Sequence, residues 1–159
     1  MPKVLGVDPG SRVVGLALLK IEKNNIKYLS SHLLKFNKGK FPSKLSFLLK
    51  QIESFIREKK PDVLVMEDNF YHKNPKVLLL LGRISGVIIA VAASLQIPVI
   101  LYSPTEIKKS ITGSGQASKE QVSYMVKKIL NLEGETLSDA TDAIAIGMSY
   151  FYKNNFLEE

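Results

Sequence analysis

The chain has 159 residues, of which 45% are hydrophobic and 23% charged, and it contains no cysteine. These values exclude a disordered chain, two full-sized domains, disulfides and thiolate metal sites, so we expect one domain over residues 1–159 in a reducing, cytoplasmic setting. Lys and Arg outnumber Asp and Glu by 22 to 15, and the net charge of +7 is compatible with a polyanionic partner such as nucleic acid.

Three strands are expected at the start of the chain. Residues 3–7 are an apolar run that ends at Asp8, and Pro9-Gly10 stops it. An apolar, β-branched pattern resumes over residues 13–19, and a third strand is predicted over residues 26–36, with Asn24-Asn25 as the hairpin turn. Met1-Pro2-Lys3 leads directly into the first strand, so we expect no signal peptide.

A helix and a parallel strand are expected next. Pro42-Ser43 begins a helix that runs to about Lys59, with apolar side chains on one stripe at helical spacing. The following apolar strand, residues 62–67, ends at Glu67. Since a right-handed crossover lays such a strand parallel to the first one, we expect Asp8 and Glu67 at the same edge of the sheet.

The segment from Ile84 to Thr105 has no charged residue and must be considered as a membrane span. Pro98 and Pro104 interrupt it, and the apolar helical part is shorter than the roughly 20 residues that a span requires. We therefore predict a buried helix from Asn74-Pro75 to about Leu95, a strand over residues 97–102 and no membrane contact.

The last third of the chain is predicted to be helical. Ser103 and Ser118 each begin a capping box, which indicates helices to about Ile111 and Leu130, with a loop at Gly113-Ser114-Gly115 between them. Ser138 is expected to cap the final helix. The fold class is therefore α/β, a mixed sheet with a three-strand antiparallel meander and parallel strands, flanked by helices.

Four acids stand out in this scheme, namely Asp8, Glu67, Asp139 and Asp142. Asp139 and Asp142 share a face in the first turn of the final helix, where acids also occur simply because they favour helix N-termini. Four carboxylates at one sheet edge would repel each other unless cations neutralised them. An all-oxygen site of this kind suits Mg²⁺, and a pair of such ions can promote phosphodiester hydrolysis.

The chain resembles the bacterial Holliday-junction resolvases of the RuvC family, within the ribonuclease H-like nuclease and integrase superfamily. The resemblance covers nearly the whole chain, and the matching stretches are Gly6-Val7-Asp8-Pro9-Gly10-Ser11 with Gly15, Glu67 followed by Phe70, Leu81-Gly82 with Gly86-Val87, Pro104 to Lys108, Gly113 to Gln121, and Ser138 to Ile146. One departure is Ser85, where the family often has a basic residue before the glycine at Gly86; Arg83 lies two positions earlier.

The resemblance implies a ribonuclease H-like fold and a structure-selective endonuclease that resolves four-way DNA junctions by paired, symmetric nicks in recombination and repair. It implies that Asp8, Glu67, Asp139 and Asp142 are catalytic metal ligands for Mg²⁺ or Mn²⁺, with two ions in each active site. It also implies DNA contacts for three residues, Phe70, Lys108 and Lys119, and a branch-migration complex of RuvA and RuvB as partner.

A homodimer is expected from the helix over residues 75–95, which is apolar nearly all round, whereas a helix in a small domain needs one apolar stripe. Gly82, Gly86 and Ala90 leave a smooth strip along it, which would suit either a partner helix or the sheet.

Other functions stay open from the sequence. A junction-binding protein without catalysis and a ribonuclease H-like nuclease acting on other nucleic acids are the alternatives. A sugar-kinase or actin-like ATPase would need a duplicated domain and a second phosphate loop, which this chain lacks.

Overall fold

The computed structural model describes residues 2–36, 40–68, 71–133 and 140–155. Its strands form one mixed five-stranded sheet in the order β3-β2-β1-β4-β5. The bounds of the strands are β1 Lys3–Asp8, β2 Val13–Glu22, β3 Asn25–Lys35, β4 Val63–Glu67 and β5 Val99–Tyr102. The expected α/β class and the meander followed by parallel strands are confirmed.

The first three strands pair antiparallel, as expected for a meander. The turn between β2 and β3 differs by one residue from the prediction, because Glu22 pairs with Asn25 and leaves Lys23-Asn24 as the turn. The pairing of Ile21 with Ile26, which is buried, explains this register. A one-residue slip would turn Ile26 toward solvent.

The two remaining strands lie parallel to β1. β4 pairs with β1, and β5 pairs with β4, so the parallel arrangement predicted from the helix between β3 and β4 is confirmed. β5 begins two residues later than expected. The N–H of Ile97 still donates to the carbonyl of Ala92 at the end of the preceding helix, and Pro98 has no N–H to donate to a neighbouring strand.

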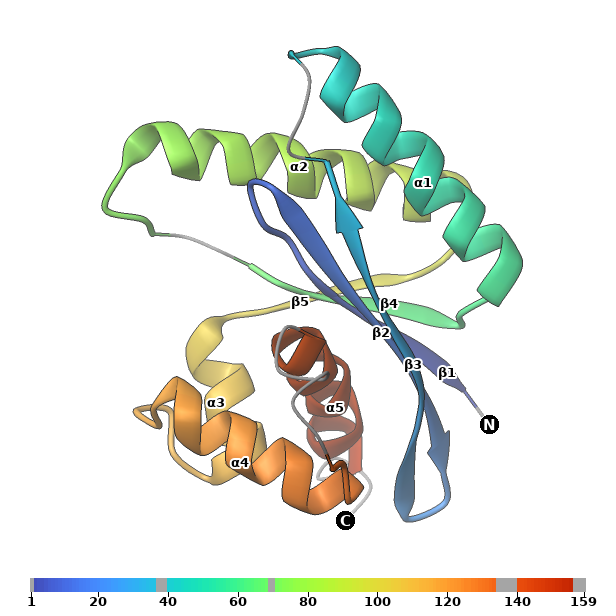
Figure 1. Ribbon diagram of the computed structural model, residues 1–159. Coiled ribbons are helices and arrows are strands. Elements are labelled where there is room, and N and C mark those ends of the chain that lie inside the picture. Colours follow the sequence, from blue (N-terminus) through green and yellow to red (C-terminus); the bar gives the residue numbers. More distant parts are fainter. Residues whose placement is uncertain (1, 37–39, 69–70, 134–139, 156–159) are drawn as a thin grey trace.

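Helices cover both faces of the sheet (Figure 1). One layer holds α1 Ser43–Lys59 and α2 Pro75–Ser94, and the other holds α3 Pro104–Thr112, α4 Lys119–Leu130 and α5 Thr141–Asn155. Alternate strand residues separate two buried clusters, so that Val4 packs beneath α5 and its neighbour Leu5 beneath α1 and α2.

The starts of the helices follow the sequence signals. Asn74 accepts a hydrogen bond from the N–H of Lys76 at the start of α2. Ser103 and Ser118 both form complete capping boxes, with Glu106 and Gln121 as the reciprocal partners. These caps fix where α3 and α4 begin, and therefore where Lys108 and Lys119 lie.

Helix α2 is only partly buried, which corrects the expectation of a buried helix. Its buried residues are Ile84, Ile88, Val91 and Ala92, all on the side that faces the sheet. The helix has 20 residues with a mean hydropathy of 2.2, which by length and composition would suffice to cross a membrane, yet only 22% of this apolar stretch is buried. The sequence could not show this, because the apolar residues run round the whole helix.

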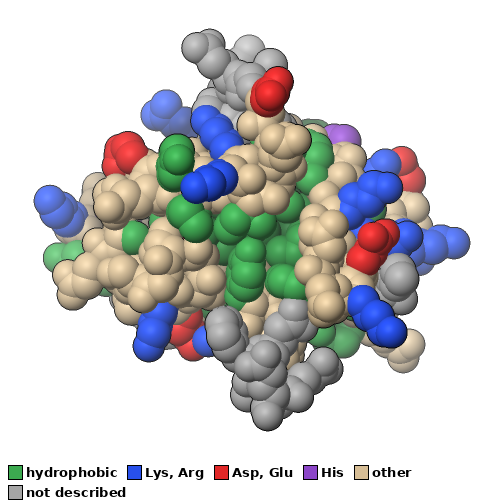
Figure 2. Space-filling view, turned by 90° about the horizontal axis from the view of Figure 1, so that it is seen from below, with side chains coloured by type: hydrophobic (Ala, Val, Ile, Leu, Met, Phe, Trp, Pro, Cys, Tyr) green, Lys and Arg blue, Asp and Glu red, His purple; other side chains and the backbone are tan. Residues whose placement is uncertain are grey.

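The surface is basic in the manner expected from the composition. The side of the molecule seen in Figure 2, which is viewed from below Figure 1, carries lysine and arginine side chains around its periphery, with acidic side chains interspersed and an apolar centre. In this view the positive charge is spread out, so a site for an anionic partner must be located by its geometry and not by charge density alone.

Candidate active site

Asp8 and Glu67 end neighbouring parallel strands. Val7 pairs with Met66 across β1 and β4, so the next residue of each strand is an acid at the carboxyl end of the sheet. Each acid is the last residue of its strand, and the apolar residues before it are buried. The strand pairing by itself therefore brings the two carboxylates to the edge of the sheet at which open α/β sheets bind ligands.

Asp142 reaches the same edge from the first turn of α5. This helix crosses β1 at very close range, because both residues at the crossing are glycines. A Cβ atom added to Gly6 would lie 2.8 Å from the backbone nitrogen of Gly147, and one added to Gly147 would lie 2.8 Å from Leu19 Cδ1. The absence of side chains at this crossing lets α5 present Asp142 beside Asp8.

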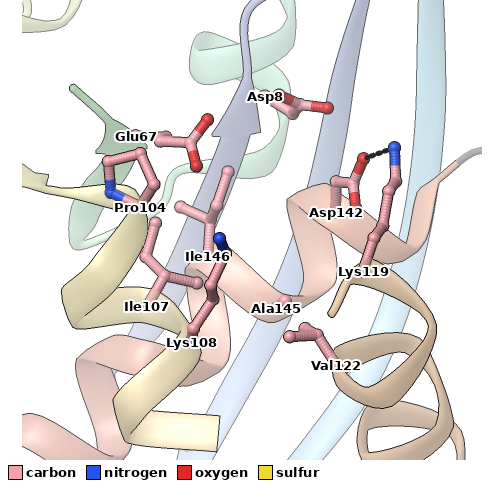
Figure 3. A pocket seen from close by; sticks show the side chains of 10 residues that line it. All are labelled: Asp8, Glu67, Pro104, Ile107, Lys108, Lys119, Val122, Asp142, Ala145 and Ile146. Carbon is pink, nitrogen blue, oxygen red and sulfur yellow. Dashed lines mark ion pairs between the residues drawn. The ribbon is translucent and has the colours of Figure 1, made fainter. Parts of the chain in front are cut away.

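The three acids and two lysines line one hollow of about 330 Å³, which we call the acidic hollow. In Figure 3, Glu67 and Lys108 lie on one side of it and Asp142 and Lys119 on the other, with Asp8 between them at the rim. The full lining is Asp8, Glu67, Pro104, Ile107, Lys108, Lys119, Val122, Asp142, Ala145 and Ile146. The floor is therefore apolar and the rim is charged.

Burial and mutual repulsion make the carboxylates difficult to ionise together. Burial, followed by the charges of Asp142 and Glu67, raises the pKa of Asp8 from 3.8 to about 7, against the opposing effect of Lys119. Burial and then the charge of Asp142 also raise the pKa of Glu67, while Lys108 and Lys119 lower it. Nearby positive charge would stabilise the ionised forms of both acids.

Lys119 supplies part of that positive charge. Its Nζ lies 2.9 Å from Oδ2 of Asp142, and this hydrogen bond and ion pair raise the pKa of the lysine. The Lys119 side chain is 77% exposed, so the pair is easily broken. Lys108 lies on the other side of the hollow and forms no ion pair within the described residues.

The donor set suits a hard divalent cation, since it consists of carboxylate oxygens. In the described part of the chain, no three Asp, Glu or His side chains are yet close enough to hold a metal ion. The side chains of Asp8, Glu67 and Asp142 nevertheless line one hollow, and the ammonium group of Lys119 already rests on Asp142. The carboxylate oxygens therefore suit a divalent cation by their chemistry, while the described acids are not gathered around a single point in this structure.

Two residues expected at the site, Asp139 and Phe70, lie outside the described residues, as does the predicted cap Ser138. Arg83, the basic residue nearest to the departure at Ser85, lies on α2 with its guanidinium 5.6 Å from the centre of the Phe41 ring. It therefore belongs to the opposite layer from the acidic hollow. The acidic hollow therefore brings together five of the seven site residues expected from the sequence, namely Asp8, Glu67, Lys108, Lys119 and Asp142.

Comparison of the chain with known protein families shows to which family it is related. The model of the family described as crossover junction endodeoxyribonuclease RuvC matches residues 4–150. The chain belongs to the RuvC family. The RuvC of Shewanella loihica is 37% identical over 152 residues, which cover 96% of this chain and 88% of the relative. The RuvC of Chloroherpeton thalassium is 40% identical over 152 residues, which cover 94% and 82%.

Solved structures agree with the RuvC fold. Thermus thermophilus RuvC in complex with a Holliday junction substrate has a TM-score of 0.89 at 23% identity, over 98% of this chain and 96% of the other. The yeast mitochondrial Holliday junction resolvase Ydc2 has a TM-score of 0.73 at 18% identity, over 98% and 80%. These likenesses establish the ribonuclease H-like fold that the resemblance implied.

Two residues beside the acids, Leu33 and Lys35, were not singled out from the sequence. Gly15, Leu33 and Lys35 line a second hollow that adjoins the first. The signal that would have found them is strand register, because Asp8 pairs with Gly15 and Gly15 pairs with Leu33. Register across β2 and β3 depends on tertiary pairing and on a bulge at Leu18/Leu19, which no local pattern reveals.

Proposed function

We propose that this chain is an endonuclease that resolves four-way (Holliday) DNA junctions in homologous recombination and repair. Membership of the RuvC family over residues 4–150 is the observation that carries this conclusion. The acidic hollow supports it, since carboxylates for cations and lysines for phosphates meet at one edge of the sheet. The reaction is hydrolysis of one phosphodiester bond in each of two equivalent strands.

The three described acids have a common role in this proposal. Asp8, Glu67 and Asp142 hold divalent cations, with Asp139 as the fourth ligand by family resemblance. Mg²⁺ is the expected ion and Mn²⁺ its substitute, with two ions in each site. Bound cations would supply activation of the attacking water and stabilisation of the departing oxygen.

Lys108 and Lys119 bind the DNA backbone on either side of the acids. Both ammonium groups reach the acidic hollow from helices with well-defined starts, so a phosphate placed between them would face Asp8. Lys119 can exchange Asp142 for a phosphate oxygen once cations neutralise the carboxylates. Phe70 stays the proposed stacking residue for bases at the crossover.

The proposed assembly is a homodimer through α2. Leu79 on this helix is 56% exposed, and Gly82 and Gly86 have open space where a Cβ atom would be. An exposed apolar strip with bare glycines suits close packing of a second, identical helix. A two-fold dimer would present two acidic hollows to two equivalent strands of a junction and so explain paired nicks.

Two further parts of the proposal rest on the family alone. The branch-migration proteins RuvA and RuvB are the expected partners, and the cytoplasm is the expected location. Copurification of RuvA or RuvB with this chain on junction DNA would test the first.

The experiment that tests the function compares three substrates of matched sequence, a four-way junction, a linear duplex and an RNA–DNA hybrid, each with Mg²⁺. We expect symmetric cleavage of the junction alone. Asp8→Asn should abolish cleavage and keep junction binding, because it removes a cation ligand and a repulsive charge. Wild-type binding without cleavage in both Mg²⁺ and Mn²⁺ would favour the non-catalytic alternative, and cleavage of the hybrid would favour a ribonuclease H-like activity.

A further inference from the structure

A second hollow of about 410 Å³ continues the acidic hollow toward the edge of the sheet, and we call it the β3 hollow. Its lining is Asp8, Val13, Gly15, Leu33, Lys35, Lys119 and Asp142. Asp8, Lys119 and Asp142 line both hollows, so the two are joined at the acids. Together they form a channel with the acids at its middle.

Strand register explains the direction of this channel. Asp8 pairs with Gly15 and Gly15 pairs with Leu33, so these residues form a row across β1, β2 and β3. Val14 and Leu34, the residues next in the chain, pack on the opposite face beneath α1 and α2. The row therefore faces α5, and the channel crosses the strands instead of following them.

Gly15 keeps this channel open between Asp8 and Leu33. A Cβ atom added at this position would lie 3.5 Å from the Cβ atoms of both Asp8 and Ala143. This is ordinary contact and no clash, so the glycine is not required by packing. Its missing side chain instead leaves bare backbone as the floor of the β3 hollow.

Lysines stand at both ends of the channel. Lys108 lines the acidic hollow, Lys35 lines the β3 hollow, and Lys119 stands between them. Lys35 ends β3, is exposed and forms no ion pair with any residue that the structure describes. A polynucleotide strand carries one negative charge per nucleotide, so a strand in the channel would meet lysines before, at and after the acids.

We propose that the β3 hollow holds the cleaved DNA strand on the side of the scissile phosphate opposite to Lys108. Lys35 binds a backbone phosphate there, and Leu33 packs against the sugar or base of the same nucleotide. This inference rests on the proposed function and adds to it a direction for the DNA strand, across β1, β2 and β3. Lys35 positions the strand and takes no part in the reaction at phosphorus.

The first test measures junction affinity for Lys35→Glu with Lys27→Glu as matched control. Lys27 is also exposed on β3, but it lies near the hairpin end of the strand. Both variants replace a positive side chain with a negative one, so their net charges are equal. In Ca²⁺, anisotropy titrations across a salt series should show at least about a tenfold loss for Lys35→Glu, with a shallower salt dependence by about one to two phosphate contacts. Lys27→Glu should bind nearly as wild type.

The second test locates the contact. Single neutral methylphosphonates are placed at each phosphate around the cleavage position, and affinity is measured for wild type, Lys35→Ala and Lys108→Ala. A modification that removes a contacted phosphate should weaken wild-type binding but have no further effect in the variant that lacks the contacting lysine. We call a phosphate silent for a lysine when its modification has no effect in the variant that lacks that lysine. The silent positions for Lys35 and Lys108 should lie on opposite sides of the scissile phosphate.

Equal affinities of Lys35→Glu and Lys27→Glu, or silent positions on the same side, would overturn this inference while junction cleavage by the wild type still stood. Failure of the wild type to bind or cleave the junction would instead overturn the proposed function. Thermal melting of each variant identifies any that fail to fold. If Lys35→Glu fails to fold, the silent positions found with Lys35→Ala decide the outcome.

Discussion

Asp8 has the most strongly shifted pKa among the acids of the acidic hollow. It ends a buried strand, faces two other carboxylates and has a pKa of about 7. The same placement that suits a cation ligand is unfavourable for the empty site, because burial and repulsion both oppose ionisation. The acids proposed to bind cations should therefore reduce the stability of the cation-free protein above the pKa values of these acids.

The pH dependence of stability follows from Asp8. In the unfolded chain its pKa is near 3.8 and in the fold about 7, so the folded state binds more protons between these values. The free energy of unfolding of the chelator-treated protein should therefore fall as pH rises from about 4 to about 7, by a few kcal/mol at most, since one pKa unit corresponds to about 1.4 kcal/mol. The raised pKa of Glu67 changes the free energy of unfolding in the same direction.

Urea unfolding with a chelator at about pH 5 and pH 8 measures this change. Asp8→Asn should show a smaller difference between the two pH values and should be more stable than wild type at the higher one. Added Mg²⁺ should stabilise the wild type at pH 8. An identical pH dependence in wild type and Asp8→Asn would contradict the assignment.

Lys119 forms an ion pair with Asp142, which is a proposed cation ligand. If the lysine competes with cations for this carboxylate, Lys119→Ala should bind divalent cations more tightly in the absence of DNA. The expected gain is about two- to fivefold, because an exposed ion pair contributes only about 0.2–1 kcal/mol. Calorimetric titration with Mn²⁺ measures it, and Lys108→Ala, which breaks no ion pair within the described residues, is the control. Weaker cation binding by Lys119→Ala than by Lys108→Ala would show that the lysine does not occupy the cation position.

The position of α5 on the sheet determines the geometry of the site. Asp142 lies in the first turn of α5, and the helix is held at β1 by contact of Gly6 with the backbone at Ala143 and Gly147. A small outward movement of this helix would carry Asp142 away from Asp8. Packing beneath the site therefore controls the distances between the acids.

Gly6→Ala should lower the melting temperature and reduce cleavage. The added Cβ atom would lie 2.8 Å from the backbone nitrogen of Gly147, and such overpacking costs about 1–3 kcal/mol. Gly15→Ala is the matched control for stability, since its Cβ atom faces the same helix at 3.5 Å from the nearest atoms. Equal melting temperatures for the two variants would mean that α5 adjusts without cost.

The two faces of the sheet have different roles in the proposal. The face covered by α3, α4 and α5 carries the acidic hollow, and α2 on the other face leaves apolar surface exposed. The DNA contacts proposed for Lys35, Lys108 and Lys119 and the dimer contacts proposed for α2 can therefore be disrupted separately.

Leu79→Lys should weaken the proposed dimer without changing the fold. Leu79 is 56% exposed on α2, so a charge there is tolerated in the free chain but would be buried in an interface. Light scattering at micromolar concentration should give twice the 17.7 kDa chain mass for wild type and about the single mass for Leu79→Lys. Leu29→Lys on β3, where Leu29 is 39% exposed, is the control and should remain dimeric.

The outcome for cleavage distinguishes assembly from activity. Leu79→Lys should still nick a junction but lose the pairing of the two nicks. A wild-type chain that scatters as a monomer and still makes paired nicks would contradict the dimer.

Local sequence signals determined most of the elements and part of the site. Apolar runs stopped by turn residues placed Asp8 and Glu67 at strand ends, and capping boxes at Ser103 and Ser118 fixed the helices that carry the two lysines. These features depend on neighbours in the chain, because strand periodicity and helix caps are local properties. The family motifs joined the separate acids into one expected site.

Contacts between elements determine how these segments meet in space. The close crossing of Gly6 and Gly147, the Lys119–Asp142 ion pair and the row from Asp8 through Gly15 to Leu33 each join residues that are distant in sequence or on different strands. The buried side of α2 was likewise invisible in an apolar run with residues on every face. Packing distance and strand register are set by contacts between elements, and a pattern within one element does not contain them.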